Sequence, residues 1–266
     1  MSVGVSLSVL PRQKNRHVVV TGASSGIGRA IALRLAAEGA NVALVARRVD
    51  KLNAVAEEVR GLGGGAAVCP CDLDDAPSVP AAFDAAVAAF GPIHALVAAS
   101  GIGGPNTPGP DDRFDAIFRT NVHGTYASIR AAEARLAPGP DARQVVVISS
   151  ILARFGVPGY TAYCASKAAL LGMVRAFALE LAGGNVHVNA ICPGWVDTDM
   201  AWEGIDGMAA GMGITRQKAH EIAMRAVPLG RMGKPEEVAG MVAWLLSTDG
   251  VGVTGQTLDM NGGAWM

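Results

Sequence analysis

The sequence has little charge, few aromatic side chains and only four cysteines. Of its 266 residues, 17% are charged and 5% are aromatic, and the formal net charge is −1. A chain without a cationic excess does not fit nucleic-acid binding, and one that is half hydrophobic does not fit a disordered segment. Glycine is abundant, with 34 copies, but follows no triplet period, which excludes collagen. These features predict a globular protein with a large core in a single domain, 1–266.

Metal binding, secretion and membrane insertion find no support in the sequence. The four cysteines are Cys69, Cys71, Cys164 and Cys192. The first two are one residue apart, without further ligands at zinc spacing, so structural thiols in a reducing cytoplasm are expected. The pair His220-Glu221 lacks the second His of a zinc-protease motif. Residues 1–10 have no basic leader, and no uninterrupted apolar run reaches the length of a membrane span.

Short β-rich runs alternate with Ala-rich helical stretches along most of the chain. Strands are expected at 17–21, 41–46, 66–71, 93–98, 144–149, 186–191 and 256–259. Helices are expected at 26–38, 52–62, 79–90, 115–136, 161–181 and 235–246. Strands that are apolar throughout belong to a parallel sheet covered on both faces, so the alternation predicts an α/β, doubly wound Rossmann fold. Residues 1–15 precede it as an N-terminal extension. Segments 101–111 and 199–227 break the rhythm and should lie at the carboxyl edge of the sheet, where ligands bind.

A glycine-rich turn joins the first strand to the first helix. Its residues are Gly22, Ser24, Ser25, Gly26, Ile27 and Gly28, in the spacing G-x3-G-x-G. The glycines permit a tight turn and a close approach of the backbone to a ligand. The following helix start offers free N–H groups and a partial positive charge, which suit a pyrophosphate. The strand–turn–helix context predicts a dinucleotide site rather than an ordinary glycine-rich loop.

Two arginines follow the second strand, where dinucleotide folds often place an acidic residue. A carboxylate at this position would repel a 2′-phosphate, whereas Arg47 and Arg48 could pair with one. This favours NADP over NAD, with NAD as the alternative if the arginines only face solvent. The pair Asp72-Leu73, just after the third strand, is a candidate contact for the adenine.

Four residues are candidates for catalysis. Tyr163 and Lys167 share one face of the helix predicted at 161–181, and the ammonium is expected to lower the pKa of the phenol, so that it exchanges protons with an alcohol or carbonyl. Ser150 ends a buried strand and could donate to a substrate carbonyl. Asn121 lies in the long predicted helix, where an amide side chain is mildly unfavourable. Taken singly, the pair could be a surface contact and the serine a turn residue; the ordered set after a dinucleotide turn is more specific.

The full set of motifs resembles the short-chain dehydrogenase/reductase family from about residue 17 to residue 263. The resemblance rests on the turn 21–28, Asp72-Leu73, Asn121, Ser150, Tyr163-Cys164-Ala165-Ser166-Lys167, residues 193–198, and the tail 253–263. It implies that Tyr163 is the general acid in reduction, that Lys167 tunes it and binds the nicotinamide ribose, and that Ser150 orients the substrate oxygen. It also implies that Asn121 holds a water in a proton relay.

The resemblance assigns further cofactor contacts and shows one departure. Pro193, Gly194, Val196 and Thr198 are expected to line the nicotinamide. Relatives usually carry Asn-Asn-Ala-Gly after the fourth strand. This chain has Ala98-Ala99-Ser100-Gly101 instead, which keeps the glycine and loses both asparagines. Ala99 and Gly101 remain candidate cofactor contacts, while the local hydrogen bonds of the missing amides need a replacement.

Segment 199–227 is expected to be the substrate lid. It contains Met200, Trp202, Met208, Met212 and Met224. Because Met is pliable, these side chains could form an adaptable apolar cover, or they could pack inward as ordinary core. Candidate substrate contacts are Leu152, Phe155, Tyr160, Trp195, Met200 and Trp202.

Within the family, residues 227–231 and 235–238 look most like 3-oxoacyl-carrier-protein reductases and polyketide ketoreductases. The resemblance therefore favours NADPH-dependent reduction of a carbonyl, on a free small molecule or a carrier-bound acyl chain. The alternatives are an NAD-dependent secondary-alcohol or dihydrodiol dehydrogenase and, in another class, a non-catalytic dinucleotide sensor. A cytoplasmic homotetramer assembled through helices 115–136 and 161–181 is also implied.

Overall fold

The computed structural model describes residues 12–75 and 77–266 and contains a seven-stranded parallel sheet. The strands are β1 (His17–Thr21), β2 (Asn41–Ala46), β3 (Gly65–Pro70), β4 (Ala95–Ala98), β5 (Arg143–Ile148), β6 (Val186–Pro193) and β7 (Thr257–Met260). Their order across the sheet is β3-β2-β1-β4-β5-β6-β7, and every neighbouring pair is parallel. The order reverses between β1 and β4, which is the switch point where such folds bind ligands. The predicted doubly wound Rossmann fold is confirmed.

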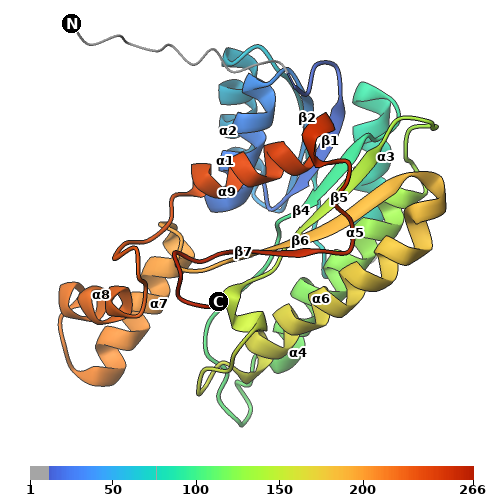
Figure 1. Ribbon diagram of the computed structural model, residues 1–266. Helices are drawn as coiled ribbons and strands as arrows, with labels where there is room; N and C mark the ends of the chain where they lie inside the picture. Colours follow the sequence, from blue (N-terminus) through green and yellow to red (C-terminus); the bar gives the residue numbers. More distant parts are fainter. Residues whose placement is uncertain (1–11, 76) are drawn as a thin grey trace, which may run out of the picture.

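Helices cover both faces of the sheet (Figure 1). They are α1 (Gly26–Ala37), α2 (Val49–Gly61), α3 (Ser78–Phe90), α4 (Phe114–Phe118), α5 (Gly124–Glu133), α6 (Thr161–Leu181), α7 (Asp199–Met212), α8 (Arg216–Arg225) and α9 (Pro235–Leu245). Residues of α1, α2 and α9 pack on one face, and residues of α3, α5 and α6 pack on the other. Helices α7 and α8 follow the carboxyl end of β6 and protrude beside the sheet in Figure 1.

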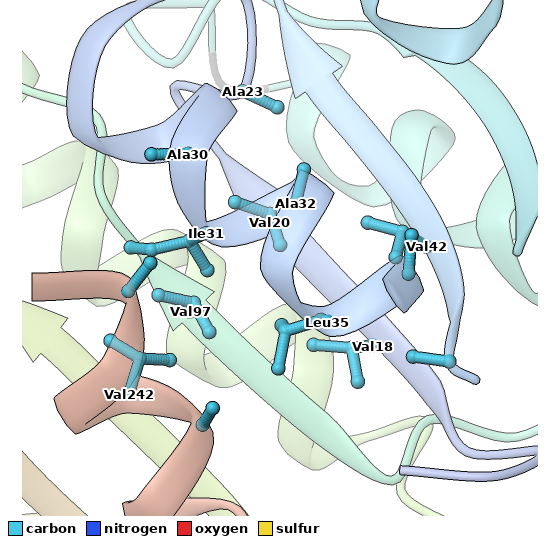
Figure 2. Packing of buried hydrophobic residues seen from close by; sticks show 14 of the residues in the cluster. Val18, Val20, Ala23, Ala30, Ile31, Ala32, Leu35, Val42, Val97 and Val242 are labelled. Carbon is cyan, nitrogen blue, oxygen red and sulfur yellow. The ribbon is translucent and has the colours of Figure 1, made fainter. Parts of the chain in front are cut away.

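The alternation of side chains along β1 explains the two layers. Val18 and Val20 pack with α1, whereas Val19 points to the opposite cluster. Figure 2 shows Ile31 and Leu35 of α1 beside these valines. All five side chains are fully buried. Burying one aliphatic side chain of this size contributes about 1.5–3 kcal/mol to folding, so both faces of the central strand anchor a layer of helices.

Two predicted elements differ from the structure. The helix expected at 115–136 is broken, because Arg119–His123 forms a π-helical turn (η1) between α4 and α5, and α5 ends at Glu133. The strand expected at 93–98 begins at Ala95, since Ile93 forms only an isolated bridge with Leu136. The lid segment, which the sequence leaves without secondary structure, folds into α7 and α8 around a small cluster of its own.

The structure can be compared with the sequence predictions for the N-terminal extension and for membrane-spanning segments. Of the expected N-terminal extension, residues 1–11 lie outside the described residues; Gln13 is buried and its Nε2 donates to Ala243 O at 3.3 Å, so this part belongs to the domain. In the described part of the chain, Thr161–Gly184 is long and apolar enough to cross a bilayer by length and composition. Its residues Leu170, Val174 and Phe177 pack on the sheet, as in a core helix.

Candidate active site

A cleft at the carboxyl edge of the sheet brings together most of the predicted cofactor residues. Those that line it are Gly22, Ser24, Ser25, Gly26, Ile27, Gly28, Arg47, Arg48, Asp72, Leu73, Ala99, Gly101, Tyr163, Lys167 and Thr198. Pro193, Gly194 and Val196 do not line it; they lie on the segment that leads from β6 to α7. The cleft also contains residues that sequence reasoning missed: Val45, Ala46, Cys71, Ser100, Ile102, Thr120, Ile148, Ser149 and Asp199. Most of these directly adjoin the motifs, and this adjacency is the signal that could have found them.

The glycine turn is fixed by contacts that leave no space for a side chain. Gly22 has φ +69°, and a Cβ there would lie 2.8 Å from Ala99 O. A Cβ on Gly28 would lie 2.2 Å from Gly22 O. The N-cap of α1, Ser25, makes no side-chain capping bond. The first N–H groups of α1 therefore have no side-chain cap at the cleft, which suits a phosphate group.

Arg48 orders the polar part of this turn. Its Nη2 donates to Ser24 Oγ at 2.9 Å and to Ser25 Oγ at 2.7 Å. Arg47 precedes it at the end of β2 and lines the same cleft. Positive charge is therefore placed beside the adenosine end expected for a dinucleotide, with hydroxyl groups held next to it.

The backbone after β4, where the sequence departs from the family pattern, is held by Thr21. Thr21, the last residue of β1, accepts hydrogen bonds at Oγ1 from Ala99 N and Ser100 N, each at 3.2 Å. A threonine hydroxyl thus satisfies two backbone donors in the segment where relatives carry asparagines. The loss of both amides leaves these two N–H groups paired.

Lys167 is buried beneath the cleft and held by the sheet. Its Nζ donates to Ile148 O at 3.0 Å and lies 5.8 Å from the centroid of the Tyr163 ring. Burial lowers the pKa of Lys167 to about 8. Ser149, at the end of β5, donates from Oγ to Lys167 O at 2.9 Å, which ties α6 to the strand. The lysine is therefore positioned next to the phenol, as the i, i+4 spacing predicts.

The pKa of Tyr163 moves opposite to the prediction. Burial raises it, and the hydrogen bond with the Ser150 side chain opposes the rise. Lys167 is not among the groups that shift it, so the expected lowering by the ammonium is wrong for the protein alone. Desolvation of the charged phenolate dominates in the protein alone. The Tyr163 hydroxyl is therefore protonated at neutral pH.

Asn121 uses its side chain to fix a loop. Its Oδ1 accepts from Ile102 N at 2.8 Å, and its Nδ2 donates to Ile102 O at 3.0 Å and to Ser166 Oγ at 3.1 Å. Ser166 Oγ in turn donates to Tyr163 O at 2.8 Å. The π-helical turn thus connects the loop after β4 with the helix that carries Tyr163. Sequence reasoning quoted Ser166 within a motif but gave it no role.

The predicted substrate contacts separate into two groups. Met200, at the start of α7, lines the cleft and is 45% exposed. Trp202 instead stacks on His220 at 5.2 Å and donates from Nε1 to Asp197 Oδ1 at 2.7 Å, so it joins α7 to α8 rather than lining the cleft. Trp195 packs against the lid cluster.

The other predicted substrate contacts lie between Ser150 and α6. Leu152 N donates to Ser150 Oγ at 3.1 Å, and Tyr160 is the N-cap residue of α6. Phe155 packs against Trp265 near the C-terminus, with ring centroids 5.7 Å apart. None of the three lines the cleft. Among the lid methionines, Met224 is buried in the lid cluster and Met208 packs against it, whereas Met200 lines the cleft and Met212 is exposed, so both the inward and the outward alternatives occur.

Comparison with known proteins identifies the family. A family model described as Enoyl-(Acyl carrier protein) reductase matches residues 22–264. A short-chain type dehydrogenase/reductase of Picea abies is 36% identical over 262 residues, covering 93% of this chain and 92% of the relative. A 3-oxoacyl-(acyl-carrier-protein) reductase of Thermotoga maritima is 32% identical over 254 residues, covering 95% and 98%. An actinorhodin polyketide ketoreductase solved with NADPH has a TM-score of 0.88 and 32% identity, covering 95% of this chain and 98% of that one. The chain belongs to the short-chain dehydrogenase/reductase family of NAD(P)-dependent oxidoreductases.

Proposed function

We propose that the protein reduces a ketone to a secondary alcohol with NADPH. The observation that carries this proposal is that one cleft contains the glycine turn with its arginines, and also Tyr163 and Lys167. Ser150 directly follows Ser149, which lines this cleft, and its side chain opposes the rise in the pKa of Tyr163. The 3-oxoacyl-carrier-protein reductase and the polyketide ketoreductase among its relatives support a carbonyl substrate of the 3-oxoacyl or polyketide type.

The residues present fit a dinucleotide that carries a 2′-phosphate. The close approach of Gly22 and Gly28 leaves the start of α1 facing the cleft, where a pyrophosphate would accept from N–H groups. Because Arg48 already holds the two serines, Arg47 is the residue we assign to the 2′-phosphate. Lys167 would hold the nicotinamide ribose, and the bound cofactor would supply the hydride.

The side chains around Tyr163 would handle the proton. Its hydroxyl would donate the proton to the carbonyl oxygen, while Ser150 donates a hydrogen bond to that oxygen and orients it. A phenol whose pKa is raised by burial is protonated at neutral pH, which suits an acid in reduction better than a base in oxidation. The Lys167 ammonium would stabilise the phenolate that forms. The side chain of Asn121 is committed to Ile102 and Ser166, so we assign it a positioning role.

The test is a Tyr163→Phe variant assayed with NADPH and 3-oxoesters. We expect kcat to fall by about 10²–10⁴-fold with NADPH binding retained, because only the transferable proton is lost. Tyr126→Phe is the matched control, since Tyr126 is exposed on α5 and removal of its hydroxyl should leave kcat unchanged. Full turnover by Tyr163→Phe would refute the catalytic role. NADPH binding without turnover of any carbonyl by the wild-type protein would favour a dinucleotide sensor.

The cofactor preference has a separate test. Arg47→Ala should weaken NADPH binding by about 10–100-fold and leave NADH unaffected, because a charge-assisted hydrogen bond contributes about 1.5–3 kcal/mol. Arg60→Ala is the control, since Arg60 lies on α2 and pairs with Glu57. A preference of the wild-type protein for NADH would instead favour the NAD-dependent dehydrogenase.

Two finer assignments belong to the same proposal. The substrate is a free carbonyl compound or an acyl chain on a carrier protein, which assays with carrier-bound and free thioesters distinguish. The assembly is a homotetramer through α5 and α6, and sedimentation measures it. Leu179 of α6 is 83% exposed, which supports an interface there.

A further inference from the structure

The loop between β4 and α4 is fastened at two points, first to Asn121 of the π-helical turn and then to the start of α6. Ile102 makes both of its backbone hydrogen bonds with Asn121. Four residues later, Asn106 Oδ1 accepts from Ala162 N at 2.9 Å, and Asn106 N donates to Gly159 O at 2.8 Å. The segment between these two points is therefore held in a defined position over the start of α6.

Gly103 lies between the two points, next to Ile102, which lines the cleft. A Cβ at Gly103 would lie 3.2 Å from Met200 Sδ and 3.6 Å from Tyr163 Cε2. Cε2 adjoins the ring carbon that carries the phenolic oxygen. The backbone of Gly103, the thioether of Met200 and the edge of the Tyr163 ring thus converge beside the hydroxyl group.

Gly103 fits this place because it has no side chain, not because of its backbone conformation. Its φ does not lie in the left-handed region, so the backbone accepts a side chain there. The neighbour that a Cβ would meet is the flexible end of Met200, which can turn away at small cost. Gly103→Ala should therefore fold and should narrow the space beside Tyr163.

We propose that Gly103 and Met200 determine which carbonyl compounds reach Tyr163. They form one wall of the substrate site, against the smaller of the two substituents on the carbonyl carbon. This wall admits a methyl group more readily than longer chains. This inference rests on the proposed function and specifies its substrate class: methyl ketones, including 3-oxobutanoyl compounds, whose larger substituent points away from this wall.

The experiment uses a homologous series of 3-oxoesters with NADPH: ethyl 3-oxobutanoate, ethyl 3-oxopentanoate and ethyl 3-oxohexanoate. In this series only the alkyl group on the ketone carbon, opposite the ester-bearing substituent, grows from methyl to ethyl to propyl. We expect kcat/KM of the wild-type enzyme to fall by about 10-fold or more from methyl to propyl, since methylene discrimination in an apolar site is of this order. Met200→Ala should flatten the series to less than about 3-fold, because it removes the flexible part of the wall.

The two positions can be tested against each other. Gly103→Ala should steepen the series by a further factor of about 5–10, and Gly103→Ala combined with Met200→Ala should return it toward the wild-type ratio, because the two groups face one another. Gly207→Ala and Met212→Ala are the controls on α7; a Cβ at Gly207 meets nothing within 4 Å, and Met212 is exposed. Neither should change the ratio.

The outcomes separate the inference from the function on which it rests. A methyl-to-propyl ratio that neither Gly103→Ala nor Met200→Ala changes would overturn the inference while leaving ketone reduction intact. A wild-type series that rises with chain length would overturn it as well. If no 3-oxoester is reduced although NADPH binds, the proposed function fails, and this inference fails with it.

Discussion

The cofactor side of the cleft and the lid are built in different ways. The glycine turn is formed by backbone segments in direct contact, and α1 behind it packs into the large cluster on the sheet. The lid helices α7 and α8 surround a separate small cluster that contains Ile205, Ala219 and Met224. One region therefore depends on the sheet for its geometry, whereas the other has its own core.

This difference separates cofactor binding from substrate selection. The segments on either side of the lid are held by backbone hydrogen bonds, from Asp197 N to Gly233 O at 2.9 Å and from Leu229 N to Gly262 O, just after β7, at 3.1 Å. Changes inside the lid can therefore alter what covers Tyr163 without altering the turn around Gly22. The comparison predicts that mutations in the two regions have different signatures, and the expectations below test this from the largest effect to the smallest.

The largest effect is expected at the glycine turn. Gly28→Ala would place a Cβ 2.2 Å from the carbonyl oxygen of Gly22. The backbone at Gly22 or at Gly28 would have to move to relieve this clash. Overpacking of this kind typically costs about 1–3 kcal/mol or more, and here the displaced atoms belong to the turn that we propose binds the pyrophosphate. We expect NADPH affinity, measured by fluorescence titration, to fall by more than 100-fold. Gly61→Ala is the control, because a Cβ there meets nothing within 4 Å. Retained affinity would show that the turn is more adaptable than its contacts indicate.

Two core truncations of similar size compare the regions directly. Leu35 in the main cluster and Ile205 in the lid cluster are both fully buried. Leu35→Ala should lower the free energy of unfolding by about 2–5 kcal/mol and reduce the melting temperature of the whole domain. Ile205→Ala creates a comparable cavity, but it should raise the KM for the carbonyl while leaving NADPH affinity unchanged. Equal losses of NADPH affinity in both variants would remove the distinction between the regions.

The same difference between the two regions determines which parts of the structure could be predicted from the sequence. Strands such as 144–149 are continuous apolar runs, and the turn 21–28 obeys local backbone rules, so the sheet and the glycine turn that lines the cleft were predictable. The π-helical turn was not, because Asn121 bonds with Ile102 and Ser166, which are distant in sequence. Nor was the place of Trp202, whose stacking on His220 depends on how α7 and α8 fold together. Contacts between residues that are far apart in the sequence determine both the π-helical turn and the place of Trp202.

A third expectation concerns the cost of burying Lys167 on the cofactor side. Burial lowers its pKa from 10.5 to about 8 in the folded protein, so folding disfavours the charged form. The unfolded chain binds more protons between these values, and the stability of the wild type therefore rises with pH over that range. The amount by which the burial of Lys167 lowers the free energy of unfolding should decrease from about 3 kcal/mol at pH 7 to about 1 kcal/mol at pH 10.

Lys167→Met removes this titration. In denaturant unfolding from pH 7 to pH 10, the variant should be more stable than the wild type at pH 7, and the difference should shrink as pH rises. Lys218→Met is the control, because Lys218 is exposed on α8 and pairs there with Glu221. A difference that grows with pH would contradict the lowered pKa.

The smallest effect is expected where the two regions meet at the start of α6. The N-cap residue Tyr160 makes no side-chain capping bond, and Asn106 supplies the acceptor from another loop, through Oδ1 to Ala162 N. Asn106→Ala should lower the free energy of unfolding by about 1 kcal/mol, as for other lost helix caps. Because the cap fixes the turn that precedes Tyr163, kcat should fall severalfold while NADPH affinity is kept.

A double variant distinguishes capping from general destabilisation. Asn106 Nδ2 donates to Asp112 Oδ1 at 3.3 Å, so Asn106→Asp combined with Asp112→Asn exchanges the two groups and keeps both an acceptor for Ala162 N and a donor between the side chains. The same Asp112 Oδ1 accepts from Phe114 N at 3.0 Å, and this hydrogen bond is lost when a donor takes its place. We therefore expect this variant to recover kcat and most of the stability. Asn106→Asp alone would place two carboxylates next to each other and should recover less. If the double variant recovered stability without kcat, the loop would support the fold only, and the position of Tyr163 would depend on α6 alone.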